Sequence, residues 1–152
     1  MSNKLSRRIF VKGSVSMAIA ATVAQYSQSV IASTHKPLTL NHEQWKPAEA
    51  ITGRLIPADE EDPGAIEAKC VYFIDKALAA EEKNYAEIYR RSLDEIERVC
   101  KSRHTTSFYQ LDTETQDAFL FDMEKDAIKE WQEDSIQPGA FFRRILSHTI
   151  YG

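Results

Sequence analysis

Residues 85–100 read Tyr-Ala-Glu-Ile-Tyr-Arg-Arg-Ser-Leu-Asp-Glu-Ile-Glu-Arg-Val-Cys, and their pattern sets the class of fold. Apolar side chains recur here at steps of three and four residues, and charged side chains occupy the other side. The apolar side consists of Tyr85, Ile88, Tyr89, Leu93, Ile96, Val99 and Cys100. This period predicts an amphipathic helix that buries one face.

A first helix is predicted upstream of this segment. Asn41 and Gln44 have the spacing of a capping box, which marks the start of a helix. Pro47 either kinks this helix or begins one a turn later, and Pro57 ends it. The apolar face that follows the capping box is Trp45, Ala48, Ile51 and Leu55.

A second helix is expected to begin at Asp62 and Pro63, because Asp is a favoured cap and Pro is tolerated at the first helical position. The loop before it, residues 57–64, is acidic. We interpret this loop as solvated, because four consecutive acids do not alternate with a Gly turn as calcium ligands do. The second helix is expected to bury Ile66, Cys70, Phe73, Ile74, Ala77 and Leu78.

Two further helices are predicted downstream. Thr113 and Gln116 are expected to form a second capping box, opening a helix with Phe119, Leu120, Met123, Ala127 and Trp131. A break at residues 137–139 separates it from a last helix with Phe141, Phe142, Ile145, Leu146 and Ile150. No segment alternates convincingly as a strand does. The sequence therefore predicts an all-α compact bundle of four to five helices.

The N-terminal segment has the order of a bacterial twin-arginine signal. Arg7 and Arg8 follow Ser6 and precede Phe10 and Lys12, as in the recognition element of such signals. A weakly apolar run, residues 15–24, comes next, too short to cross a bilayer as a helix. A small-residue cleavage site follows, and Ala32 is the expected last residue removed. The alternative interpretation is a chance arginine pair in a cytoplasmic basic arm.

This segment divides the chain and predicts its location. Residues 1–32 are the expected signal peptide, residues 33–40 a linker and residues 41–152 one helical domain. The protein is expected in the periplasm, and the twin-arginine translocase is an expected partner. Because that route exports folded proteins, the chain either folds around something in the cytoplasm or carries a folded partner out.

Charge excludes two classes of partner. The expected signal holds four basic residues and no acid, so its removal shifts the formal charge from −4 to −8. A domain this acidic lacks the clustered Lys and Arg that bind nucleic acid. It also lacks a polybasic patch for anionic lipid, so contact with a membrane is expected only through a complex.

Residues that carry chemistry are scarce, and no catalytic residue is predicted. Glycines are scattered singly, so a flavin or nicotinamide has no recognisable cradle. The spacing of His42, His104 and His148 does not favour a metal site. A metal site of these three residues is nevertheless the alternative in which the chain itself is an enzyme. No cofactor or metal is therefore expected in this chain.

The cysteines and the aromatic residues leave alternatives open. Cys70 and Cys100 either pair as a disulfide in an oxidising periplasm or lie buried as free thiols. The aromatic side chains are expected in the core, although some could form an exposed docking face. This set is Tyr85, Tyr89, Phe73, Phe119, Phe141 and Phe142.

Several blocks resemble the gluconate 2-dehydrogenase subunit 3 family. They are Arg-Leu-Ile-Pro-Ala-Asp at residues 54–59, Pro-Gly-Ala at 63–65 and Val-Tyr-Phe-Ile-Asp-Lys-Ala-Leu at 71–78. Phe141-Phe142 and the final His-Thr-Ile-Tyr-Gly at 148–152 resemble a later block. Members of the family usually continue through an aromatic, Asp-Pro and Gly-rich tail, whereas this chain ends at Gly152. The expectation is either a truncated gene or a short member.

The resemblance implies a three-part periplasmic complex at the inner membrane. A large flavoprotein subunit with FAD oxidises a sugar or sugar acid, and a multihaem cytochrome subunit with haem c passes the electrons on. The small subunit is implied to be non-catalytic and to help the flavoprotein mature and cross the membrane. The residues expected to dock this partner are Arg54, Pro57, Asp59, Pro63, Gly64, Phe73 and Asp75.

A protein of another class remains an alternative. A free-standing periplasmic binding or stress protein would hold an apolar ligand between its helices. It would purify alone, without a flavin-containing partner.

Overall fold

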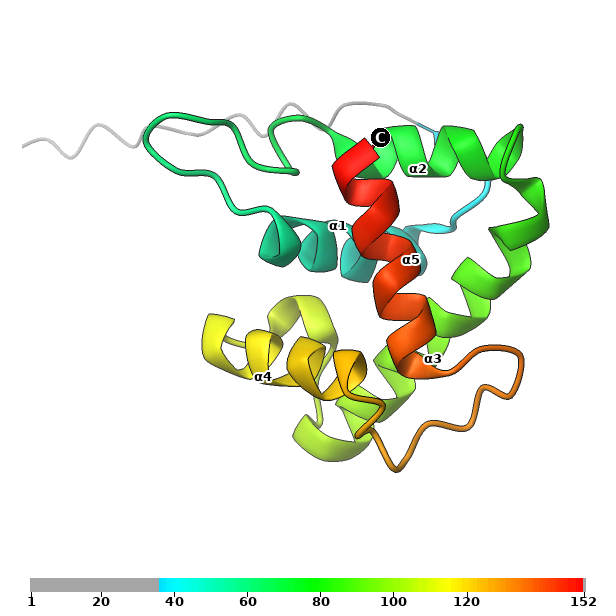
Figure 1. Ribbon diagram of the computed structural model, residues 1–152. Coiled ribbons are helices and arrows are strands. Elements are labelled where there is room, and N and C mark those ends of the chain that lie inside the picture. The colour runs from blue at the N-terminus through cyan, green and yellow to red at the C-terminus, as the bar shows by residue number, and fades with distance from the viewer. Residues whose placement is uncertain (1–35, 152) are drawn as a thin grey trace, which may run out of the picture. The chain divides into compact units, whose positions relative to one another are not determined.

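The computed structural model describes residues 36–151, which form five α-helices joined by turns and two short 3₁₀ helices, with no strand among them (Figure 1). The α-helices are α1 (His42–Leu55), α2 (Cys70–Ala79), α3 (Ala86–His104), α4 (Thr113–Glu124) and α5 (Pro138–Tyr151). The 3₁₀ helices are η1 (Lys83–Tyr85) and η2 (Phe108–Gln110). The predicted all-α class and the number of helices are confirmed.

The predicted signal lies outside the residues that the structure describes. This applies to Ser6, Arg7, Arg8, Phe10 and Lys12 and to the expected cleavage site at Ala32. Within residues 36–151, no helix has the length and apolar character needed to cross a bilayer.

Helix α3 supplies the largest buried face. Tyr89, Leu93, Ile96 and Val99 have no exposed surface, and α3 contacts both α1 and α5. Burying an aliphatic or aromatic side chain of this size contributes about 1.5–3 kcal/mol each. The helical period of residues 85–100 therefore predicts the centre of the core correctly.

The predicted start of α1 is confirmed. The Asn41 side chain accepts a hydrogen bond from the Gln44 N–H at 2.9 Å, and Gln44 Oε1 accepts one from the Asn41 N–H at 3.1 Å. Pro47 lies inside α1, so the helix does not begin a turn later. Ile56 follows the last helical residue, and Pro57 is the first residue beyond this cap.

The predicted start of α2 is wrong. Residues 65–69 form a turn, and α2 begins only at Cys70 because Lys69 adopts a left-handed conformation at φ 58°. A hydrogen bond of 2.8 Å from the Ala65 N–H to Ile56 O ties this turn to the end of α1. Asp62 therefore caps no helix.

The buried face of α2 also differs from the prediction. The face consists of Cys70, Val71, Ile74, Asp75 and Leu78. Ile66 in the preceding turn is 51% exposed, and Phe73 on the helix is 52% exposed, although both were expected in the core. An apolar stripe that includes Ile66 as a helical residue also includes Phe73. Ile66 lies in the turn before α2, however, and Phe73 lies on the exposed side of the helix.

Helix α4 starts and ends earlier than predicted. Asp112, not Thr113, is its cap, since the Asp112 side chain accepts a hydrogen bond from the Thr115 N–H at 2.9 Å. The helix ends at Glu124, and Asp126 is left-handed at φ 54°. Trp131 therefore lies in a loop, where its indole N–H donates to Ile136 O at 2.9 Å.

The loop before α5 is held by α3 and in turn caps α5. Glu95 on α3, paired with Arg98, accepts the Gln132 N–H at 2.5 Å. Asp126 accepts the Gly139 N–H at 2.7 Å, so a side chain of this loop caps α5. Residues 138 and 139 thus begin α5 instead of forming only a break. Helix α5 then packs against α4, α1 and α2.

The two cysteines are separate buried thiols in the structure. Burial raises the pKa of the Cys100 thiol to about 12. The Cys70 thiol lies 3.6 Å from Thr149 O and so joins α2 to α5.

A buried carboxylate on α2 holds the backbone that leads into α1. Asp75 has no exposed surface. One of its oxygens accepts the Leu38 N–H at 2.6 Å, and the other accepts the N–H groups of Thr39 at 2.9 Å and Leu40 at 2.8 Å. Hydrogen bonds to a charged group are among the stronger ones in proteins. The entry to α1 is therefore fastened to the middle of α2.

We expect Asp75→Asn to lower the free energy of unfolding by roughly 2–4 kcal/mol. The amide keeps one acceptor oxygen, but its NH₂ group faces a backbone N–H group where the second carboxylate oxygen accepts a hydrogen bond. Chemical denaturation measures this effect. Glu67→Gln, a change of the same kind at an exposed position before α2, is the control and should leave stability within about 0.5 kcal/mol. Equal stability of the two variants would contradict the anchoring role.

Candidate functional site

The residues predicted to dock a partner separate into two groups in the structure. One group makes contacts inside the domain, and the other lies at the surface. Arg54 belongs to the group with internal partners. Its guanidinium forms a two-point contact with Asp117 of α4, with both N–O distances at 2.8 Å. This hydrogen bonding lowers the pKa of Asp117. Arg54 therefore joins α1 to α4.

The acidic loop is exposed but organised by its own hydrogen bonds. Pro57, Asp59 and Pro63 lie at the surface. One oxygen of Asp59 accepts the N–H groups of Glu61 and Asp62 at 2.9 and 2.8 Å, and these bonds lower the pKa of Asp59. The expectation of a solvated loop agrees with this exposure.

Gly64 and Asp75 have internal roles, contrary to the docking prediction. Gly64 is buried, and a Cβ atom at this position would lie 2.4 Å from Ala58 N, so only glycine fits where the loop closes on itself. Asp75 is fully buried and bound to the backbone before α1. Phe73, in contrast, presents its ring to solvent.

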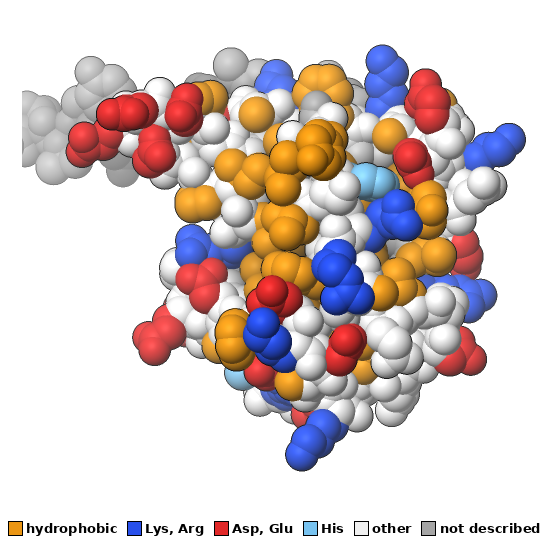
Figure 2. Space-filling model, viewed as in Figure 1, with side chains coloured by type: hydrophobic (Ala, Val, Ile, Leu, Met, Phe, Trp, Pro, Cys, Tyr) orange, Lys and Arg blue, Asp and Glu red, His pale blue; other side chains and the backbone are white. Residues whose placement is uncertain are grey.

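Exposed apolar side chains gather near α2 and α5. Phe73 on α2 and Ile150 and Tyr151 on α5 are 52%, 55% and 85% exposed. Figure 2 shows apolar side chains grouped where the last turns of α5 lie against α2, with charged side chains mostly around them. We call Phe73, Ile150 and Tyr151 the α2–α5 apolar surface. Clustered exposed apolar groups of this kind mark sites of interaction.

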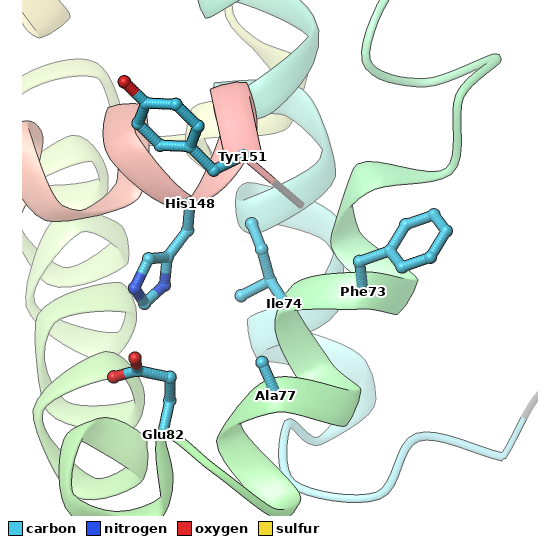
Figure 3. Close-up of a pocket in the computed structure, with 6 residues that line it drawn as sticks. All are labelled: Phe73, Ile74, Ala77, Glu82, His148 and Tyr151. Atoms are coloured by element: carbon cyan, nitrogen blue, oxygen red, sulfur yellow. The ribbon is translucent and has the colours of Figure 1, made fainter.

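A pocket of about 210 Å³ opens within this surface (Figure 3). In Figure 3 the rings of Phe73 and Tyr151 point outward at its rim, while the side chains of His148 and Glu82 point toward each other on one side. The lining is Phe73, Ile74 and Ala77 from α2, Glu82 from the turn before η1, and His148 and Tyr151 from α5. The pocket therefore combines apolar walls with one carboxylate and one imidazole.

His148 is positioned by aromatic side chains. The Tyr89 hydroxyl and His148 Nδ1 share a hydrogen bond of 2.8 Å, and the two ring planes differ by 6°. Tyr85 meets the imidazole edge-on, and the Arg144 guanidinium lies 3.8 Å from the centre of the Tyr85 ring. Burial lowers the pKa of His148, while the charge of Glu82 raises it and that of Arg144 lowers it. Near neutral pH the imidazole is therefore mostly uncharged.

The alternative metal site does not form among the residues that the structure describes. His42 begins α1 and His104 ends α3, both exposed, whereas His148 is half-buried on α5. No three His, Cys, Asp or Glu side chains in residues 36–151 come together as metal ligands. His42, His104 and His148 therefore do not come together as the disfavoured alternative site would require.

Glu82 and Tyr151 were not predicted as site residues. Glu82 lies in a turn between two helices, where a single acid in a polar stretch carries no signal of a site. Tyr151 follows His148 by three positions, and residues at this spacing share a helix face. That spacing was the one available sign that an aromatic side chain stands beside the imidazole.

These features define a small all-α module whose most distinctive surface is an apolar pocket with one carboxylate and one imidazole. The model of the family Gluconate 2-dehydrogenase subunit 3 matches residues 42–152, and the chain belongs to this family. The name of the family denotes a subunit of a multi-subunit gluconate dehydrogenase complex. The family resemblance drawn from the sequence is confirmed. No curated protein and no solved structure gives a significant match to the chain.

We expect His148 to titrate below the ordinary imidazole pKa of 6.5, because burial disfavours the charged form. Glu82→Gln should lower this pKa further, since the carboxylate favours the imidazolium. NMR titration of the His148 ring protons measures both shifts. Glu81→Gln, at an exposed neighbouring position, is the control and should have little effect.

The same shift has a consequence for stability. The unfolded chain binds a proton at His148 more readily than the folded chain does. The contribution of His148 to stability is therefore intact above pH 6.5 and declines as the pH falls from 6.5 through the lower pKa of the folded state. A folded-state pKa at or above 6.5 would contradict this environment.

Proposed function

We propose that this chain is the non-catalytic small subunit of a periplasmic, membrane-associated dehydrogenase of gluconate or a related sugar or sugar acid. In this role it assists the maturation and twin-arginine export of a large flavoprotein subunit. FAD belongs to that subunit, and haem c belongs to a multihaem cytochrome subunit. The family match over residues 42–152 carries the proposal.

The exposed apolar surface supports a role in assembly. Phe73 and Tyr151 are large aromatic side chains with more than half of their surface exposed, and they border one pocket. Aromatic side chains are enriched at the centres of protein interfaces, where few residues supply most of the binding energy. We infer that the α2–α5 apolar surface contacts the flavoprotein subunit.

The order of the N-terminal segment supports the export role. Arg7 and Arg8 lie in a twin-arginine pattern, and the route that reads this pattern carries folded cargo. A flavoprotein folds around its cofactor before export, so one signal on a bound small subunit serves both chains.

Replacing Arg7 and Arg8 together by Lys is expected to leave this chain and its flavoprotein in the cytoplasm, because the change keeps the charge and removes the guanidinium pair. Cell fractionation with antibodies to both chains measures this. Lys4→Arg, which also keeps the charge and lies outside the pair, is the control. A flavoprotein that still reaches the periplasm would contradict the escort role.

Phe73→Ser is expected to weaken binding of the flavoprotein by about tenfold or more, because large aromatic side chains often act as interface anchors. Phe121→Ser on α4 is a matched control, since Phe121 is 60% exposed but lies outside the α2–α5 apolar surface. Quantitative co-purification from membranes measures both. Equal retention by the two variants would place the interface elsewhere.

The same co-purification tests the proposal as a whole. Flavin and c-type haem absorbance with a large oxidoreductase chain supports the subunit role. A colourless chain that purifies alone would contradict it and favour a free-standing periplasmic binding or stress protein.

A further inference from the structure

The carboxylate of Glu82 lines the pocket without a hydrogen-bonded or ionic partner among residues 36–151, although the residue is only partly exposed. Glu95, by contrast, is paired with Arg98, and Glu97 accepts the Phe108 N–H at 3.0 Å. Glu82 is therefore a charge held at an apolar pocket without a counter-ion of its own.

The groups that face the pocket leave its negative charge largely uncompensated. His148 is mostly neutral near pH 7, and its Nδ1 is already bonded to the Tyr89 hydroxyl. The guanidinium of Arg144 is stacked on Tyr85 and does not line the pocket, whereas Glu82 does. The pocket therefore favours a cation over an anion.

The size and walls of the pocket limit what the cation can be. A volume of about 210 Å³ is below the roughly 300–1,000 Å³ usual for cofactor and drug-sized ligands. The walls of Phe73, Ile74 and Ala77 are apolar. Lys and Arg side chains have this combined character, since an apolar stem lies along apolar surface while the charged head reaches a polar partner.

We propose that this pocket receives one lysine or arginine side chain of the flavoprotein subunit, with its stem between Phe73 and Tyr151 and its charged head paired with Glu82. The inference rests on the proposed function and deepens it by naming the feature of the partner that is recognised. A partly buried ion pair inside a pocket is screened less by salt than one on the open surface. It also aligns the partner, because charge complementarity fixes the orientation of docking.

The test is the affinity of the full small subunit for its flavoprotein, measured with Glu82→Gln and Ala77→Leu. The first variant removes the charge, and the second fills the pocket. We expect each to weaken binding by about tenfold or more. Glu81→Gln and Ala79→Leu make the same changes at exposed neighbouring positions and should bind as the unchanged protein does.

A charge exchange gives a second readout. Glu82→Lys should abolish binding, and replacing one Lys or Arg of the flavoprotein by Glu should restore it. If the flavoprotein binds the unchanged protein and the Glu82 and Ala77 variants equally well, the pocket assignment is overturned while the subunit role stands. If the unchanged protein binds no flavoprotein, both are overturned.

Discussion

The carboxylate of Asp75 is the internal anchor from which the surface of this domain follows. It accepts three backbone N–H groups from residues 38–40, so it must face the interior, and this sets the rotation of α2 about its own axis. Residues two positions apart on an α-helix point about 200° apart. Phe73 is therefore directed outward by the same contact that buries Asp75, and its exposure is a consequence of the fold.

The position of α5 completes the surface. The Tyr89 hydroxyl binds His148 from α3, and the Cys70 thiol meets Thr149 O from α2, so both helices hold the last turns of α5. Tyr151 and Phe73 thereby lie at the rim of one pocket, and the side chains of His148 and Glu82 point toward each other (Figure 3). Two segments far apart in the sequence, residues 73–82 and 148–151, form the pocket, and each is fixed by a contact in or beside the core.

This arrangement relates stability to the proposed assembly. The core holds Asp75, Tyr89 and Thr149 in buried polar contacts, while Phe73 on α2 and Ile150 and Tyr151 on α5 remain at the surface. A small subunit needs a rigid display of this kind, because binding costs less when the interface is already ordered. The acidic loop at residues 57–63 is exposed too, but its hydrogen bonds are mostly its own.

The sequence by itself determined the all-α class, the buried face of α3, the Asn41–Gln44 capping box and the family. These depend on periodicity and on contacts between residues three or four positions apart, which can be read directly. Only the tertiary structure decided where α2 begins, where α4 ends and that Phe73 is exposed. Those features follow from long-range contacts, such as Ala65 to Ile56 and Asp75 to residues 38–40. The pocket is also a feature that only the tertiary structure decides, because Glu82 and His148 meet only once α2, α3 and α5 have packed together.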